Sequence, residues 1–213
     1  MSRTDLQVPF SEKDEAKSLG ARWDASNKTW YVPENIDLSK FQKWMPPAFE
    51  PNIVASSYFI AQNTKSCWKC NQSTRIYGFL LPSGHRTKDY IEHDDGTDEE
   101  VWSVSSEQTI LSYITTLPRE VESRVAKISR HYKPDFSKTT QSAYWMNHCE
   151  KCGMKQGDFN IFDEPQGGFL FLYPEEAKSV ILYHITEPFE AECGGYSYDV
   201  EFFKYMQQQP FQQ

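Results

Sequence analysis

Four of the five cysteines form two C-x-x-C pairs, and these pairs offer the clearest chemistry in the sequence. The pairs are Cys67 with Cys70 and Cys149 with Cys152. A tight turn lets both thiolates of such a pair point at one ion, with a Zn–S distance of about 2.3 Å. Asn71 and Gly153 directly follow the pairs, and Gly and Asn most readily adopt the left-handed backbone such a turn needs. We therefore predict a structural Zn²⁺ site with four thiolate ligands.

Redox chemistry, disulfide bonds and coincidence remain as alternatives for the paired cysteines. A redox-active C-x-x-C motif usually occurs once, at the start of a helix, and nothing in the sequence indicates an oxidising compartment. The gap between Cys70 and Cys149 is long, whereas a compact ribbon separates its pairs by about 15–20 residues. The sequence thus predicts either a zinc ribbon with a long insertion or a metal clip between distant parts of one domain.

The remaining cysteine and the histidines give no second site. Cys193 stands alone and is expected to be a free, partly buried thiol. His148 precedes Cys149 and could replace a thiolate, although a supporting or surface role is the simpler interpretation. The other histidines lack the mutual spacing of a catalytic metal site; they are His85, His93, His131 and His184.

Catalytic motifs are also missing from the sequence, which contains no GxSxG, P-loop, GxGxxG or HExxH pattern. A site with four thiolates leaves no open position for water or substrate. A metal-dependent hydrolase that uses Asp158, Asp163 or Glu164 is the weakest alternative. We expect a protein that binds rather than catalyses.

Length and composition describe a chain that can fold without cross-links. Its 213 residues allow one or two domains. Hydrophobic residues make up 38%, but aromatic residues reach 15%, so rings supply much of the core. No apolar run of about 18 residues occurs, and the first residues lack the apolar segment of a secretory signal. We therefore expect a cytoplasmic protein.

The net charge of −8 weighs against general binding to nucleic acid, because phosphates repel an acidic chain. Acidic and basic residues balance over residues 1–46, so the excess lies in the remainder. The densest acidic segment is expected to be a solvated loop, with a cation site or a recognition loop for a basic partner as alternatives. Its acidic members are Glu92, Asp94, Asp95, Asp98, Glu99 and Glu100.

The first 46 residues predict a small β-α-β-α domain. Alternation over residues 6–10 indicates a strand, and Ser11 is expected to cap a helix over residues 12–19 that stops at Gly20. A strand follows over residues 29–32. A second helix is expected to begin at Asp37 or Ser39 and to include Trp44.

The segment VPFSEKDEAKSLGARWDASNKTWYVP, residues 8–33, resembles a small bacterial domain of unknown function. That domain is found fused to plasmid and phage DNA primases and to antirestriction-type proteins. The resemblance implies a link to mobile-element or defence biology and a DNA-related accessory role, but no established activity. The residues themselves offer a basic, aromatic face that could stack single-stranded bases, while the tryptophans could equally form a small core. The candidate binding residues here are Arg22, Trp23, Lys28 and Trp30.

Residues 47–56 are rich in proline and predict a linker, residues 57–206 a second domain, and residues 207–213 a frayed tail. Strands are expected to flank each cysteine pair, at 58–61 and 76–81 and at 142–148 and 158–162. Further strands are expected at 101–104, 169–173 and 180–185, with a strand or short helix at 198–205. A helix capped by Ser105 or Ser106 is expected to reach Ile114. Residues 144–165 resemble uncharacterised bacterial ribbon proteins, which implies a shared architecture only.

An amphipathic helix is predicted after Pro118, because Val121, Val125 and Ile128 recur at helical spacing. Its opposite face is the most basic surface in the sequence. That face is either solvated or contacts phosphate or an acidic partner. Its candidate binding residues are Arg124, Lys127 and Arg130, and Arg119 and Lys133 extend it.

These features together predict an α+β protein with a small α/β domain followed by a domain built around a split zinc ribbon. The preferred interpretation is a bacterial, non-enzymatic, zinc-stabilised accessory protein of mobile-element or defence biology. It recognises a protein partner, for example a basic one, through an acidic, aromatic-rich surface. The alternative is a nucleic-acid-binding accessory factor that uses the N-terminal domain or the basic helix face. No membrane partner is expected.

Overall fold

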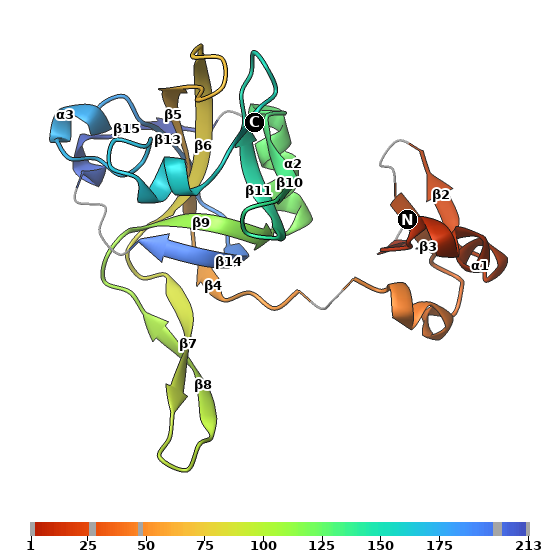
Figure 1. Ribbon diagram of the computed structural model, residues 1–213. Helices are drawn as coiled ribbons and strands as arrows, with labels where there is room; N and C mark the ends of the chain where they lie inside the picture. Colours follow the sequence, from red (N-terminus) through yellow and green to blue (C-terminus); the bar gives the residue numbers. More distant parts are fainter. Residues whose placement is uncertain (1–2, 26–28, 47–48, 198–201, 212–213) are drawn as a thin grey trace. The chain divides into compact units, whose positions relative to one another are not determined.

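A computed structural model describes residues 3–25, 29–46, 49–197 and 202–211, and the chain divides into two units (Figure 1). The units are Met1–Phe49 and Glu50–Gln213. The chain is mixed α and β, with far more strand than helix. Among the described residues, no helix is both long and apolar enough to cross a membrane.

The first unit is a three-stranded antiparallel sheet covered by short helical turns. The sheet order is β1-β3-β2, with Leu6 paired to Trp30 and Trp23 also paired to Trp30. Its core is small and contains Leu6, Ala16, Ala21, Val32, Phe41 and Trp44. The elements are β1 (Arg3–Leu6), η1 (Phe10–Glu12), α1 (Lys13–Ser18), β2 (Arg22–Asp24), β3 (Thr29–Pro33) and η2 (Leu38–Trp44), where η1 and η2 are 3₁₀ turns.

The predicted β-α-β-α order of this unit is not what the structure has. The first strand lies earlier than expected, because Pro9 cannot donate to a ladder and the chain turns into η1. Ser11 does not cap α1; Glu12 occupies that position without a side-chain cap. β2 is an additional strand, and the second helix is the 3₁₀ turn η2, with Asp37 accepting a hydrogen bond from Ser39 N at 3.0 Å.

The second unit is built on a sheet of nine strands in the order β15-β13-β5-β6-β9-β14-β4-β7-β8. A smaller sheet has the order β10-β11-β12. The strands of the large sheet are β4 (Ile53–Ala55), β5 (Tyr58–Ser66), β6 (Ser73–Leu81), β7 (Arg86–Glu92), β8 (Asp98–Val104), β9 (Thr109–Thr116), β13 (Ile181–Ile185), β14 (Phe189–Ser197) and β15 (Gln207–Pro210). The other elements are α2 (Arg119–Ile128), β10 (Tyr132–Ser137), β11 (Ser142–His148), β12 (Lys155–Gln156), the π-helical turn η3 (Phe159–Asp163), α3 (Pro174–Ala177) and the 3₁₀ turn η4 (Phe203–Tyr205).

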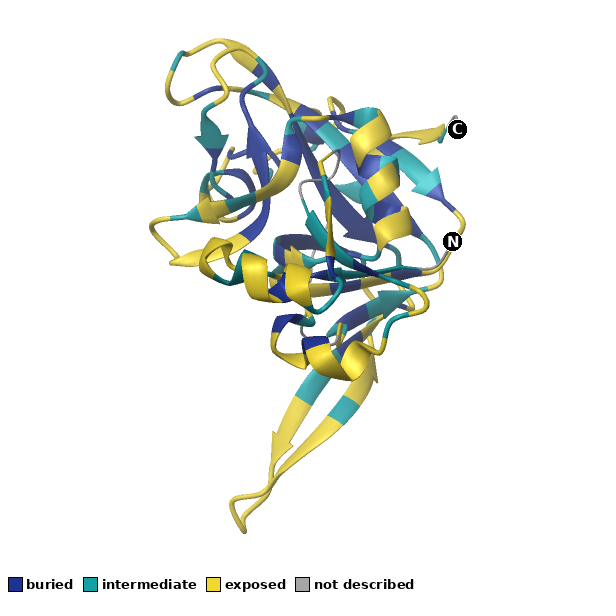
Figure 2. Cartoon of the chain, turned by 90° about the vertical axis from the view of Figure 1, so that its right-hand side faces the viewer, coloured by how far each residue is buried: buried dark blue, intermediate teal, exposed yellow. Residues whose placement is uncertain are grey.

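Residues of β5 and β6 alternate between two core clusters, as the period of a strand requires. Ile60 and Phe79 belong to the cluster that includes Val121 of α2. Phe59 and Leu80 belong to a second cluster, which the segment from η3 to α3 completes. The central strands are therefore covered on both faces (Figure 2).

Three predicted elements of this unit are wrong. Residues expected to form a helix up to Ile114 form strand β9, because β-branched side chains favour a strand and one face meets the core. Residues 158–162 are not a strand, because Phe159–Asp163 is the π-helical turn η3. Residues 169–173 are not a strand either, because Phe169 turns inward and stacks on Phe162 at 5.4 Å.

The segments predicted as linker and tail both contain strands. Ile53–Ala55 is strand β4, which pairs with β14 and β7. Gln207–Pro210 is strand β15, which pairs in parallel with β13. The acidic segment, expected to be a loop, is the end of the β7–β8 hairpin with a turn over residues 93–97. Residues 198–201 of the segment predicted as strand or helix lie outside the described residues.

Candidate metal centre

The two C-x-x-C pairs lie on matching turns at the ends of two strand pairs. The first turn joins β5 to β6 and the second joins β11 to β12. In the first, Cys67 N donates to Gln72 O at 2.9 Å and Asn71 N donates to Cys67 O at 2.8 Å. In the second, Cys149 N donates to Met154 O at 2.8 Å and Gly153 N donates to Cys149 O at 2.9 Å. The two turns therefore present their sulfurs in the same way.

Both turns use the left-handed conformation that the sequence predicts. Asn71 has φ +57° and Gly153 has φ +71°. This conformation turns the chain sharply enough to direct both sulfurs of a pair to one side. The amide groups of Lys69 and Lys151 then donate to Cys67 Sγ and Cys149 Sγ, each at 3.4 Å.

All four sulfurs lie within 4.8 Å of one another. Cys67 Sγ is 3.7 Å from Cys152 Sγ, and Cys70 Sγ is 3.7 Å from Cys149 Sγ. Sulfurs at the corners of a tetrahedron with Zn–S bonds of about 2.3 Å are about 3.8 Å apart. The four cysteines are free thiols, and their arrangement could hold a metal ion.

Contacts between β11 and β6 bring the two turns together. Asn147 Oδ1 accepts a hydrogen bond from Tyr77 N, and Asn147 Nδ2 donates to Tyr77 O, both at 2.8 Å. Glu150 N donates to Thr74 Oγ1 at 3.0 Å. Arg75 pairs with the Glu150 carboxylate at 2.8 Å through Nε and at 2.7 Å through its NH2 group.

Backbone amides and the neighbouring sulfurs control the ionisation of the cluster. Burial raises the pKa of Cys67, but the N–H groups of Cys70 and Lys69, together with the thiols of Cys149 and Cys152, outweigh this effect and lower the pKa to about 6. In Cys149, burial likewise opposes the backbone amides, and its pKa is lowered. The pKa of Cys152 is raised despite the Met154 amide, because burial and the neighbouring sulfurs disfavour another negative charge. A bound cation would neutralise this accumulation of charge.

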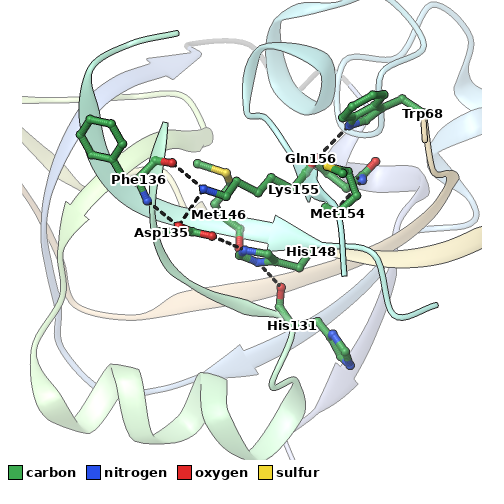
Figure 3. Close-up of polar contacts among 9 residues, drawn as sticks. All are labelled: Trp68, His131, Asp135, Phe136, Met146, His148, Met154, Lys155 and Gln156. Carbon is green, nitrogen blue, oxygen red and sulfur yellow. Dashed lines mark hydrogen bonds and ion pairs between the residues drawn. The ribbon is translucent and has the colours of Figure 1, made fainter. Parts of the chain in front are cut away.

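Two side chains beyond the cysteines support the cluster. Buried Gln156 donates from Nε2 to Cys67 Sγ at 3.3 Å. Trp68, in the first turn, donates from Nε1 to Lys155 O at 2.7 Å and so links the first turn to β12 (Figure 3). Nothing in the local sequence pattern identified Gln156 or Asn147 as part of the site, because their partners lie on distant segments.

His148 does not join the sulfurs; it belongs to a polar network with Asp135 and His131 (Figure 3). Its Nε2 lies 2.9 Å from Asp135 Oδ2, and its Nδ1 lies 3.0 Å from Met146 O and 3.2 Å from His131 O. All of these oxygens can accept a hydrogen bond when Asp135 is ionised, so both ring nitrogens of His148 face acceptors. Lys155 Nζ completes the network, 2.8 Å from Asp135 Oδ1.

The other predicted site residues lie apart from the cysteines in the sequence. Arg124 is engaged within the fold: it contacts Tyr58 Oη at 3.2 Å and pairs with Glu187. Lys127 is exposed on α2, and Arg130 donates from Nε to His131 Nε2 at 3.2 Å. Cys193 is buried on β14 and its N–H donates to Asn52 Oδ1 at 3.0 Å.

In the first unit, Trp23 is 51% exposed and its ring lies 5.6 Å from that of Trp30. Both rings line a groove of about 580 Å³ together with Phe10. Arg22 is exposed on β2. Lys28 lies outside the described residues.

The acids considered for hydrolysis do not form a metal site with one another. Among the described residues, the four cysteines are the one group of three or more side chains placed to share an ion. Asp158 is buried, and Oδ2 accepts a hydrogen bond from Tyr113 N at 2.7 Å. Asp163 accepts a hydrogen bond from Tyr113 Oη at 3.2 Å.

Comparison with known proteins identifies relatives of the N-terminal unit. Residues 3–46 match a family model described as a domain of unknown function (DUF5710). Two curated proteins from Escherichia coli, each named DNA primase TraC, are 57% identical to this chain over 42 residues. That match covers 20% of this chain, and 4% and 3% of the two primases, so the chain spans only a small part of their length. No solved structure matches. The expected resemblance of the N-terminal residues is confirmed, whereas the family match ends at residue 46 and leaves the expected ribbon relatives unconfirmed.

Proposed function

We propose that this protein is a non-enzymatic, zinc-stabilised accessory protein of mobile-element biology that binds a basic protein partner. Three observations support parts of the proposal: the cysteine cluster, the primase-related N-terminal unit, and a projecting acidic hairpin. The acidic β7–β8 hairpin is the observation that supports a protein partner.

The metal is Zn²⁺, held by Cys67, Cys70, Cys149 and Cys152. Four thiolates with near-tetrahedral sulfur spacing suit Zn²⁺, and they fill its coordination sphere. Such an ion holds structure instead of activating water. The ion would link the two cysteine turns and so join the ends of the long segment between them. This segment includes the β7–β8 hairpin.

Among the described residues, strand pairing joins the β7–β8 hairpin to the rest of its unit at its base. β7 pairs with β4 through Thr87 and Arg86, and β8 is the last strand in the nine-strand order. The hairpin projects from the unit and is mostly exposed (Figures 1 and 2). A two-stranded ribbon without further cover is marginally stable, so a partner that covers one face would stabilise it.

One face of this hairpin combines apolar rings with acidic groups. Residues directly paired across the strands share a face, which places Tyr90, Trp102 and Val104 together. These side chains are 67%, 37% and 70% exposed. Towards the tip the same face carries Glu92, Asp98 and Glu100. Towards the base it carries Arg86 and Lys88, and Lys88 pairs with Glu100 at 3.0 Å. An aromatic centre bordered by charge is typical of a protein interface, and the acidic tip with Glu92 and Asp98 favours a basic partner.

The test is affinity isolation of the full chain from its native cells, followed by quantitative mass spectrometry. We expect a basic protein in stoichiometric amount, and its loss with the variant Tyr90→Ser/Trp102→Ser/Glu100→Gln. Glu120→Gln/Glu175→Gln is the matched control, because both acids are exposed elsewhere. Equal recovery with all three chains would contradict the proposal.

A second candidate function is binding of single-stranded nucleic acid by the N-terminal unit. Its support is the identity with part of a DNA primase and the groove that Trp23, Trp30 and Phe10 line. Exposed rings beside cations can stack bases. We expect the chain to bind single-stranded DNA with an affinity that falls steeply as the salt concentration is raised. Trp23→Ala should weaken this binding. Salt-independent or absent binding would reject this candidate.

A further inference from the structure

A cleft of about 320 Å³ lies where the end of α2 meets the second cysteine turn. Arg130 and His131 line it from the segment after α2, Arg75 lines it from β6, and Glu150 and Lys151 line it from the cysteine turn. This grouping of cations is unexpected in a chain with a net charge of −8. It therefore needs an explanation beyond an average solvated surface.

Two of the three cations in this cleft lack an acidic partner. Arg75 forms the ion pair with Glu150 described above. Arg130 donates to a ring nitrogen of His131, a neutral acceptor. In the part of the chain that the structure describes, neither Arg130 nor Lys151 forms an ion pair with a carboxylate. The cleft thus retains positive charge that an anion would neutralise.

The pKa of His131 responds to the positive charge of this cleft. Burial lowers the pKa of His131, and Arg130 lowers it further, with smaller effects from His148 and Lys133. Glu150 opposes them without reversing the direction. Of these effects, the one that comes from Arg130 is electrostatic, and the same positive charge favours a bound anion.

A second cleft of about 440 Å³ adjoins the first and shares Arg75 and Ile128 with it. Tyr183 of β13 and Phe211, next to β15, contribute rings to its lining. Gln62 and Gln209 contribute amide groups, and Tyr183 Oη donates to Gln62 Oε1 at 3.5 Å. Rings that can stack and amides that can donate and accept are the groups that recognise a nucleobase.

We propose that the two adjoining clefts bind a nucleoside phosphate, with the phosphoryl group on Arg75, Arg130 and Lys151 and the base against Tyr183 and Phe211. Guanidinium and ammonium groups bind phosphoryl oxygens through charge-assisted hydrogen bonds. The ligand is either a free nucleotide or the phosphorylated end of a single strand. The site is independent of the protein partner proposed for the hairpin.

The test is calorimetric titration of the metal-loaded full chain with five probes. These are inorganic phosphate, adenosine, adenosine 5′-monophosphate, and a single-stranded DNA hexamer of deoxyadenosine with and without a 5′-phosphate. We expect the monophosphate to bind more tightly than phosphate, and adenosine not to bind. A phosphorylated hexamer that binds tighter than the monophosphate identifies a strand end as the source, and equal affinities identify the free nucleotide.

Variants separate the two halves of the site. Arg130→Gln/Lys151→Gln should weaken binding of the monophosphate about tenfold. Lys138→Gln/Lys178→Gln, which removes two exposed cations outside the clefts, should leave it unchanged. Tyr183→Leu should weaken the monophosphate about tenfold and leave phosphate affinity unchanged. Zinc content checks that each variant is folded at the cysteine turn. The proposal is overturned if no phosphorylated probe binds, if adenosine binds as well as its monophosphate, or if the Arg130/Lys151 variant binds like the control.

Discussion

The buried side chain of Asn147 pairs with the backbone of Tyr77, 70 positions earlier in the chain. Through two reciprocal hydrogen bonds of 2.8 Å, the side-chain amide of Asn147 satisfies the backbone N–H and C=O of Tyr77, as a neighbouring strand would. Cys149 follows two residues later. The position of the second cysteine turn therefore depends on this side chain.

Asn147→Ala is expected to reduce the free energy of unfolding by about 2–3 kcal/mol, because it leaves the N–H and C=O of Tyr77 buried without partners. Urea denaturation of the metal-loaded chain measures this change. Ser123→Ala, at an exposed position of α2, is the control and should change little. Equal stabilities of the two variants would show that the Asn147 amide does not hold β11 on β6.

Gln156→Leu is expected to lower metal affinity without abolishing binding. Gln156 donates to Cys67 Sγ but supplies no ligand of its own. Loss of a hydrogen bond that orients a metal ligand typically costs 10–100-fold in affinity, so we expect about that range. Competition with a zinc-binding dye measures the affinity. An unchanged metal affinity would show that Gln156 does not support the metal site.

Asp135→Asn is expected to lower stability at neutral pH by about 1–2 kcal/mol. The hydrogen bond from Lys155, followed by that from His148, holds the pKa of Asp135 far below its ordinary value. The stabilisation is therefore present above the unfolded pKa of about 3.9 and is lost as the pH falls below it. The difference between wild type and variant should be constant from pH 7 to pH 5 and should shrink below about pH 4.

Because acid also releases metal from thiolates, the quantity compared is the difference in unfolding free energy at each pH. Asp94→Asn in the exposed hairpin turn is the matched control. A difference for Asp135→Asn that stays constant through acid would show that its carboxylate charge is not the source of stability.

Asp158→Asn is expected to stabilise the protein at alkaline pH. Burial, with a smaller contribution from Asp163, raises the pKa of Asp158 to about 7, although the Tyr113 amide opposes this change. Because the folded pKa lies above the unfolded value, the stability linked to this proton is complete below about pH 4 and is lost as the pH rises through about 7. An asparagine can still accept from Tyr113 N but carries no charge.

We expect the free energy of unfolding of Asp158→Asn to exceed that of the wild type by about 2 kcal/mol at pH 8 and to equal it near pH 4.5. Chemical denaturation at the two pH values gives both numbers. A variant that is less stable than wild type at pH 8 would mean that the ionised carboxylate is required by the fold.

The local sequence was sufficient to predict the parts of the site that one short segment determines. The spacing within each cysteine pair and the left-handed positions at Asn71 and Gly153 follow from neighbouring residues alone. The contacts that unite the two turns could not be predicted, because they join Asn147 to Tyr77 and Glu150 to Arg75 between segments far apart in the sequence, from β11 and its turn to β6 of the other sheet. Local spacing carries no information about such distant partners.

The wrong elements have a common physical cause. Ile110, Leu111 and Ile114 match helical spacing, but these positions lie in strand β9, where neighbouring strands supply its hydrogen bonds. Residues 158–162 look like a strand, but Phe162 folds over Gly78, where an added Cβ would lie 2.9 Å from its ring. In both places tertiary packing overrides the local pattern.

Zinc K-edge X-ray absorption of the purified full chain is the most direct test of the shared metal. The account predicts one zinc per chain with four sulfur neighbours at about 2.3 Å, and loss of that signal in Cys70→Ser/Cys149→Ser. A chain that folds without stoichiometric zinc, or a zinc surrounded by nitrogen and oxygen, would contradict it.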